Sequence, residues 1–322
     1  MQLYYQIISK IKKHHTIVAK NKEHLETIID KEIRKYGNQC NLNHIDTSLI
    51  EDMSFLFYSS QFNGDISQWN TSNVQCMKNM FDKSIFNGDI SQWDTSKVVN
   101  MGAMFRKSKF NGDISKWNTS NVINMYYLFS FSKFSGNISG WDLSNLENAA
   151  YMFFYNSVFN GDISEWNTSN VKTMKSMFEE SKFNGDISAW NVSQVENMES
   201  MFLKSIFNGN INQWDTSNVE NMLGMFSESQ FNGDISQWNI SQVQSMEAMF
   251  YEAIFNKDLS NWCPVNLKNT KKFMYNCTAP IPYWVEIENF QDRQNAIEAY
   301  QCKKGLGKLI NSNHVDKKII KL

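Results

Sequence analysis

The chain has 322 residues, a formal net charge of −2 and an apolar fraction of 42%. A charge this close to zero excludes the strongly basic surface by which proteins hold nucleic acid or an anionic membrane, so neither partner is expected. The five cysteines are scattered and form no C-x-x-C pair, which excludes a zinc knuckle or dithiol redox motif and favours reduced thiols. No metal site and no cofactor are therefore predicted.

The N-terminal segment, residues 1–40, is predicted to be a helical cap for the repeats that follow it. Leu25, Ile28 and Ile29 fall on one helical face, and Gly37 is a suitable residue to end the helix. An array of stacked repeats would otherwise expose its apolar core and unpaired backbone at this end. Lysines interrupt the apolar residues near the start of the chain, which predicts neither a signal peptide nor a membrane span.

A repeated unit of 24 residues occupies most of the chain. Its tryptophans are separated by 24 residues in every step but one, the 25-residue step between Trp141 and Trp166. A fixed period of about 20 to 50 residues is typical of stacked repeats, in which each unit contacts only its neighbours. The tryptophans in register are Trp69, Trp93, Trp117, Trp141, Trp166, Trp190, Trp214, Trp238 and Trp262.

Each unit, here called a coil, is predicted to contain one short strand and one short helix. Residues 65–69 follow an Asn-Gly turn and have the character of a strand. Apolar residues then stand at Val74, Met77, Met80 and Phe81, a spacing that predicts one face of a short helix. The strands of successive coils would be parallel and about 4.8 Å apart. The predicted fold class is therefore an α/β repeat, a solenoid with helical caps at both ends.

The coils can be compared with one another, and residues at the same position of successive coils are here called a row. The row of Phe81 holds phenylalanine in coil after coil, which predicts a core position. The row of Lys83 holds both Lys107 and Glu180, and a position that accepts either charge is expected to face water. The extra residue of the 25-residue step falls near Tyr155, in a turn, where an insertion costs least.

Residues 280–322 are predicted to form a C-terminal helical cap and a basic tail. All three prolines lie beyond the last tryptophan in register and mark the end of the array, which is assigned to residues 41–279. Residues 289–302 have the pattern of an amphipathic helix, and a loose tail follows from Lys308.

The row of Asp65 has two possible roles. Stacked carboxylates could bind calcium, because hard cations prefer clustered oxygen ligands. Asn137 and Asn210 occupy the same row, however, and an asparagine there favours a hydrogen-bonding turn residue. A calcium-loaded array remains an alternative to this structural role.

The tryptophan row could be an exposed strip for sugars or a part of the core. Ile45 holds the same position one coil before Trp69, which favours burial, with the indole N–H satisfied near the edge. Catalysis needs unlike residues that converge in one pocket, and a uniform array offers no such set. The chain is therefore predicted not to be an enzyme, and no catalytic residue is assigned.

The predicted function is that of a binding scaffold, which acts through the polar residues of the predicted strands. Many weak, repeated contacts along such a face would add up for an extended protein or glycan ligand. The candidate binding residues are Asp65, Ser67, Gln68, Asp89, Ser91, Gln92, Asp113, Ser115, Lys116, Asp162, Ser164, Asp186, Ser188, Asp234, Ser236 and Gln237.

The repeat Phe-Asn-Gly-Asp-Ile-Ser-x-Trp-Asn-Thr-Ser-Asn-Val-x-x-Met-x-x-Met-Phe resembles that of the BspA-like bacterial surface proteins. That repeat, of about 25 residues, also occurs in mycoplasma surface lipoproteins. The resemblance covers residues 42–275 and implies a leucine-rich-repeat-like solenoid. It also implies a role in adhesion, or in contacts with a host or with other proteins, and brings no catalytic residues.

Two locations remain open. The resemblance implies the cell surface, whereas the absence of an export signal in residues 1–18 implies the cytoplasm. The alternative function is accordingly a cytoplasmic protein-interaction or structural repeat protein with no surface role. The identity of the ligand and the oligomeric state are not predicted.

Overall fold

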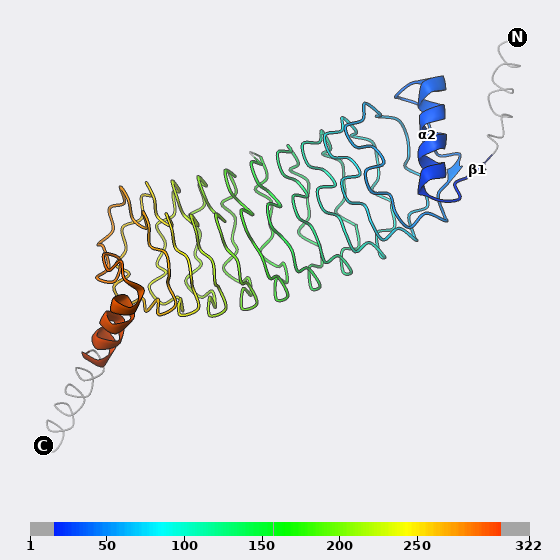
Figure 1. Ribbon diagram of the computed structural model, residues 1–322. Coiled ribbons are helices and arrows are strands. Elements are labelled where there is room, and N and C mark those ends of the chain that lie inside the picture. The colour runs from blue at the N-terminus through cyan, green and yellow to red at the C-terminus, as the bar shows by residue number, and fades with distance from the viewer. Residues whose placement is uncertain (1–15, 157, 304–322) are drawn as a thin grey trace, which may run out of the picture.

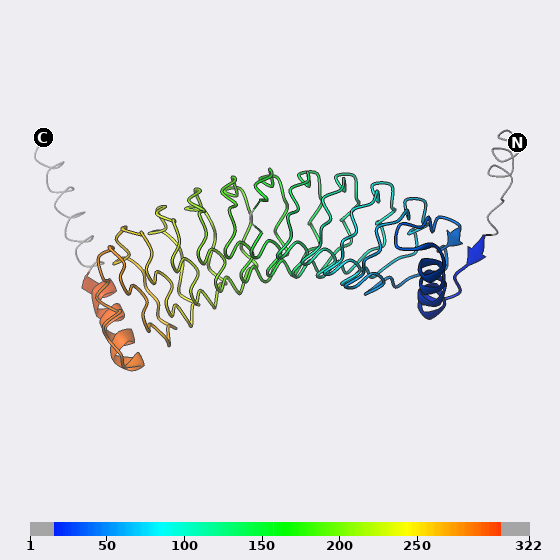
Figure 2. The same ribbon diagram turned by 90° about the horizontal axis from the view of Figure 1, so that it is seen from above.

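The computed structural model describes residues 16–156 and 158–303. Over these residues the chain winds into an elongated, gently curved array of coils stacked side by side, with a helix at each end (Figures 1 and 2). The repeat organisation predicted from the tryptophan spacing is confirmed. The first part of the predicted N-terminal helix, residues 1–15, and the basic tail from Lys308 lie outside the described residues.

The predicted strand within each coil is wrong in its position. Residues 66–69 form a turn in which the Trp69 N–H donates to the Ile66 carbonyl oxygen at 3.2 Å. One parallel bridge, between Asn41 and Asp65, lies at the start of the predicted strand. The other bridges between coils lie in the row of Cys76, which runs from Asp52 to Asn269. Each coil therefore contacts the next through the segment that was predicted to be a helix.

That segment is a run of hydrogen-bonded turns. Every second N–H group bonds within its own coil. The N–H groups of Met80, Asp82 and Ser84 each donate to the carbonyl oxygen three residues earlier, at 3.1–3.2 Å. The N–H groups between them bond to the next coil. They donate to its carbonyl oxygens at 2.7–2.9 Å, and the donors are Met77, Asn79, Phe81 and Lys83. The first and last of these turns have a positive φ at the third residue, 57° at Asn79 and 60° at Lys83. Apolar residues three apart fit such turns as well as a helix, which explains the wrong prediction.

The core consists of columns of side chains, with one member from each coil. Phe81 and Phe105 are fully buried, and their ring centroids lie 5.8 Å apart in a stacked arrangement. Trp69 stacks on Trp93 at 6.3 Å, and Phe86 packs against Phe81 at 4.5 Å. Because each ring buries its faces against the neighbouring coils, a coil gains most of its stability from the coils beside it.

At the N-terminal end, β1 (Ile17–Val18) pairs in parallel with β2 (Ile45–Asp46), and α2 (Lys22–Tyr36) lies beside the first coil (Figure 1). Asn21 caps the start of α2 with its side chain. Gly37 ends the helix with a φ of 83°, as predicted. The side chains of α2 that are buried in the same core as the coils are Leu25, Ile28 and Ile29.

At the C-terminal end, a helix begins at residue 290 and is described through residue 303 (Figure 1). Ile297 is buried, and so is Arg293, which is only 2% exposed. The Arg293 guanidinium donates to the carbonyl oxygens of Leu267, at 2.7 Å, and Ile287, at 2.6 Å. Burial lowers the pKa of Arg293. Nowhere in the described part of the chain does a helix have the length and apolar character that crossing a bilayer requires.

Candidate functional site

The candidate binding residues lie along what is here called the Asp–Ser edge, the rows of Asp65, Ser67 and Gln68. The aspartates are exposed and the serines half-buried. In each case the aspartate Oδ1 accepts a hydrogen bond from the backbone N–H two residues later, as Asp89 does from Ser91 at 2.9 Å. This closed local ring is an Asx turn. The same contact occurs at Asp65, Asp113, Asp162, Asp186 and Asp234.

Asparagine at two places in this row makes the same turn. The Oδ1 of Asn137 accepts from the Ser139 N–H at 3.0 Å, and the Oδ1 of Asn210 makes the equivalent contact at 3.1 Å. The turn therefore depends on an acceptor oxygen and not on a charge. Where the residue is an aspartate, the hydrogen bond favours the ionised form: the Ser115 N–H holds the pKa of Asp113 below its ordinary value.

The Asp–Ser edge still presents unused polar groups. One carboxylate oxygen of each aspartate closes the turn; the second oxygen of Asp65 accepts from Asn41 Nδ2 at 2.8 Å. The exposed side chains of the Gln68 row lie beside the aspartates. Gln92 Nε2 donates to Ser91 Oγ at 3.2 Å, so neighbouring candidate residues contact one another within a coil. Lys116 takes the place of this glutamine in its coil and is exposed. What the edge offers is a repeated set of acceptors and donors at the surface.

Two asparagine rows bind successive coils together, and neither was predicted from the sequence. The Oδ1 of Asn63 accepts from the N–H of Asn87, in the next coil, at 2.8 Å. Asn73 Nδ2 donates to the carbonyl oxygen of Ser48, in the preceding coil, at 2.8 Å. The signal was present in the sequence, because both rows keep asparagine in most coils while the neighbouring surface rows vary.

The tryptophan row belongs to the core, as predicted. Each tryptophan in register exposes only 1–4% of its surface. Its indole N–H is satisfied by the preceding coil: Trp93 Nε1 donates to the Ile66 carbonyl oxygen at 3.2 Å. A buried indole with its donor occupied cannot stack on a sugar, so the sugar strip considered for this row is excluded.

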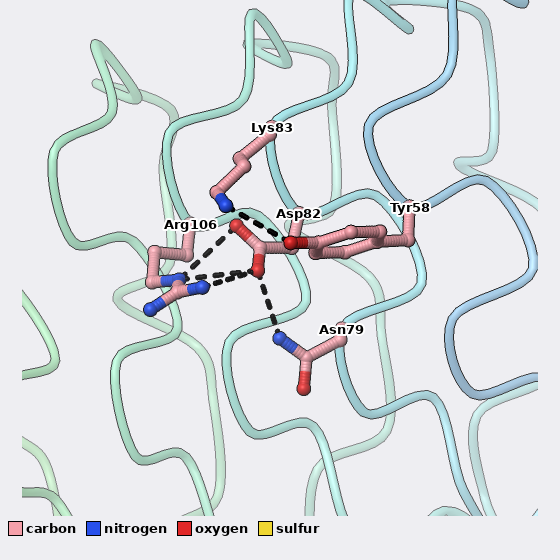
Figure 3. Close-up of polar contacts among 5 residues, drawn as sticks. All are labelled: Tyr58, Asn79, Asp82, Lys83 and Arg106. Atoms are coloured by element: carbon pink, nitrogen blue, oxygen red, sulfur yellow. Dashed lines mark hydrogen bonds and ion pairs between the residues drawn. The ribbon is translucent and has the colours of Figure 1, made fainter.

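A buried ion pair joins two coils on the turn segments (Figure 3). Asp82 is fully buried, and its Oδ2 accepts hydrogen bonds from Arg106 Nη2 at 2.6 Å and from Asn79 Nδ2 at 2.9 Å. Asp82 and Arg106 are 24 residues apart and so share a row. The hydrogen bond from Arg106 to Asp82 raises the pKa of the arginine. Because both groups are occupied by each other, the pair serves structure.

Aromatic side chains, some exposed and some half-buried, gather on the turn segments of two adjacent coils, at positions for which the sequence predicted only variability. Phe131 and Tyr155 expose 40% and 51% of their surface, with ring centroids 5.2 Å apart. Tyr127 stacks on Tyr151 at 4.3 Å. This aromatic patch comprises Tyr126, Tyr127, Phe131, Tyr151, Phe154 and Tyr155. Comparison of the rows could have found it, because most coils have charged or small residues at these positions.

The described residues, 16–156 and 158–303, contain no group of three His, Cys, Asp or Glu side chains placed to hold a metal ion. All five cysteines lie within these residues, and none of them is in a disulfide there. Burial raises the pKa of Cys76 and of Cys277, which keeps both protonated and poorly nucleophilic. The Asp–Ser edge and the aromatic patch are two surface features of the described residues from which a function can be argued.

A comparison with curated proteins gave no match, and a comparison with solved structures gave none. A family profile, described as a Mycoplasma protein of unknown function, DUF285, matches residues 30–134, 128–227 and 182–284. These overlapping matches run from the second half of α2 through the coils. The chain therefore belongs to the DUF285 family, a group of Mycoplasma repeat proteins of unknown function.

Proposed function

We propose that this chain is a leucine-rich-repeat-like solenoid with helical caps, and that it acts as a non-enzymatic binding scaffold. The observation that supports the proposal is the contrast between its polar rows. The asparagine rows are consumed by bonds between coils, whereas the Asp–Ser edge keeps exposed carboxylates in coil after coil. Identical acceptors repeated along a rod suit an extended glycan or protein whose own donors repeat, because weak contacts then add up.

The test is the binding of the full chain to glycan and matrix-protein arrays, with a variant of the Asp–Ser edge as the comparison. Asp113→Asn combined with Asp162→Asn removes two charges and keeps both Asx turns, because Asn137 makes the same turn in the coil between them. We expect this variant to bind more weakly. Glu196→Gln with Glu220→Gln removes the same charge from another exposed row and should bind as the unaltered chain does. Equal binding by all three proteins would refute the role of the edge.

We further propose that the scaffold works at the cell surface, in adhesion, as in the BspA-like proteins. The support is the resemblance of the repeat, together with membership of a Mycoplasma repeat family. Protease treatment of intact cells that produce the chain tests the location. Cleavage of the chain is expected, with a cytosolic enzyme as the protected control. Protection of both proteins would contradict the surface role and favour intracellular partners.

A further inference from the structure

One row on the turn segments has a basic residue at one end, an acidic residue at the other and two aromatics between them. Turned end for end, this row is complementary to itself. Along the array it runs Lys107, Phe131, Tyr155 and Glu180: a base, two aromatics and an acid. The two aromatic side chains are 40% and 51% exposed, and Lys107 is exposed as well. Lys107 Nζ lies 4.8 Å from the centre of the Phe131 ring, and the rings of Phe131 and Tyr155 are 5.2 Å apart. These residues are here called the central row.

The aromatic pair of the central row is costly to leave in water. All four of its residues have a positive φ, 52–55°, which asparagine or glycine adopts more readily than a bulky aromatic. Asn276 occupies the same row in a later coil, so the array does not require an aromatic there. Together with the rest of the aromatic patch, Phe131 and Tyr155 form a contiguous, partly exposed apolar surface of the kind that marks an interface.

The charges at the two ends of the central row have no counter-ion among the described residues. Neither Lys107 nor Glu180 takes part in an ion pair there, whereas Lys204, farther along the row, contacts Glu228 at 3.7 Å. Glu179 lies next to Glu180 and is half-buried. Burial, with the charge of Glu180 nearby, raises the pKa of Glu179. An approaching cation would relieve this acidic end, and an approaching anion the basic end.

Two copies of the chain related by a two-fold axis can pair the basic end of each central row with the acidic end of the other. If the axis passes between Phe131 and Tyr155, the two aromatics of one copy meet the two of the other, and Lys107 of each copy meets Glu180 of its partner. The next members of the row, Lys83 and Lys204, would face each other and set the limit of the contact; in their own chain Lys83 donates to the Tyr58 hydroxyl at 2.9 Å and Lys204 contacts Glu228. We propose that the central row is the contact surface of an antiparallel homodimer, and that its occupant is a second copy of this chain. Such an isologous contact presents the same patch twice, which is the commonest symmetry of soluble oligomers.

A different partner would fit less well. An acidic peptide would pair with Lys107 but would bring its charge against Glu179 and Glu180, and a basic peptide would do the reverse. The self-complementary order is therefore what favours a second copy. The central row spans about 15 to 20 Å at the usual spacing of stacked chains, so the contact is at the small end for stable interfaces. A weak, concentration-dependent dimer is the expected state.

Sedimentation equilibrium of the full chain over a wide range of concentrations tests the proposal. We expect a monomer–dimer equilibrium that weakens as salt is raised, because its ion pairs lie at the surface. A chain that stays monomeric at the highest concentration would overturn the proposal. So would the growth of larger assemblies without a dimer, because end-to-end stacking does not close.

Exchanging the charges of Lys107 and Glu180 tests whether the central row is the dimer contact. Lys107→Glu and Glu180→Lys should each weaken the dimer, and the chain that carries both should recover it. Both substitutions use residues already present in this row, at Lys204 and Glu228, so the backbone tolerates them. Each pair occurs twice in the dimer, so a change of about fivefold per pair becomes about twenty-fivefold in Kd. A double exchange that leaves the dimer as weak as either single variant would count against the pairing.

A separate variant tests the contribution of Phe131 and Tyr155 to the dimer contact. Phe131→Asn with Tyr155→Asn introduces a residue that adopts a positive φ more readily than an aromatic does, as Asn276 does in this row, so the fold should persist while the dimer is lost. Lys116→Glu, on the Asp–Ser edge, is the matched charge reversal and should leave the equilibrium unchanged. Dimerisation that survives the aromatic variant, or that is lost with Lys116→Glu, would place the contact elsewhere. Because the Asp–Ser edge is not altered in the aromatic variant, ligand binding and dimerisation are tested separately.

Discussion

Asp82 depends on a single arginine for its charge balance. It is fully buried, and Arg106, whose side chain is 29% exposed, is the cation that contacts it. Removing one partner of such a pair leaves a buried charge without compensation. We expect Arg106→Met to lower the free energy of unfolding by about 2 to 3 kcal/mol, less than for a wholly buried pair, because water can reach the site. Urea denaturation of the two proteins measures the difference.

The control for this prediction removes both charges. Ser130 and Ser227 occupy the row of Asp82 in other coils, so the array accepts serine there. Asp82→Ser combined with Arg106→Ser should therefore be more stable than Arg106→Met alone. If the double variant is the less stable of the two, the loss comes from packing of the arginine and not from the uncompensated, buried charge of Asp82.

The Asx turns make the stability of the chain sensitive to acid. The N–H two residues later lowers the pKa of the row members Asp113, Asp162, Asp186 and Asp234. A carboxylate with a lowered pKa in the folded state contributes its stability above its unfolded-state pKa, about 3.9. That contribution is lost as the pH falls through the lower folded-state value. Thermal unfolding between about pH 6 and pH 2 should show this loss.

Replacing these four aspartates by asparagine should remove part of the acid sensitivity while the fold is kept. The amide oxygen makes the same turn, as at Asn137 and Asn210, and it does not titrate. The melting temperature of this variant should fall less on acidification than that of the unaltered chain. Parallel curves for the two proteins would show that acid acts through other carboxylates.

The same geometry predicts the response to calcium. Each aspartate of the Asp–Ser edge already uses one oxygen in its turn, and asparagine replaces it in two coils, which interrupts any continuous set of carboxylates. A cation site needs several oxygen ligands around one point. We expect the melting temperature to be the same with calcium, with magnesium and with chelator. A rise specific to calcium would revive the calcium-loaded alternative.

At the scale of the elements, the sequence predicted which residues are buried better than it predicted the backbone. The period placed Trp69 and Phe81 in the core, because residues that repeat in every coil must stack on themselves. The helix predicted at residues 74–84 was wrong, because a run of turns buries residues three apart just as a helix does. The period also implied the contact between Asp82 and Arg106, which are 24 residues apart, but nothing in it indicated that Asp82 is buried.

Helix α2 packs apolar side chains into the core that the coils share. Leu25 is fully buried in the continuous core of the array. Leu25→Ala should therefore cost about 2 to 5 kcal/mol in the free energy of unfolding, and the exposed coil edge should promote aggregation. Glu26→Ala, on the exposed side of α2, is the matched control. Thermal unfolding and light scattering would distinguish them, and equal behaviour would contradict a capping role for α2.

For the whole molecule, the structure implies that stability is built up coil by coil. Hydrogen bonds of the backbone and of side chains join each coil to the next, such as the one between Asn63 and Asn87. The columns of core side chains also continue from coil to coil without a break. An array of this kind should keep its fold when its length changes by whole coils, because each new junction repeats an existing one. A globular domain with a single closed core would not tolerate such a change.

Deleting residues 184–231 tests this property. The deletion removes 48 residues, which is two periods of 24, and joins Phe183 to Asn232, the same Phe-Asn step that occurs in the other coils. We expect a folded, shorter chain with a lower melting temperature, since fewer junctions stabilise it. Deleting residues 184–219 removes one and a half coils and is the control, because it places unlike rows side by side and should unfold the array. If both deletions unfold the chain, its coils do not act as a one-dimensional array, and cooperation over the whole length must hold the fold together.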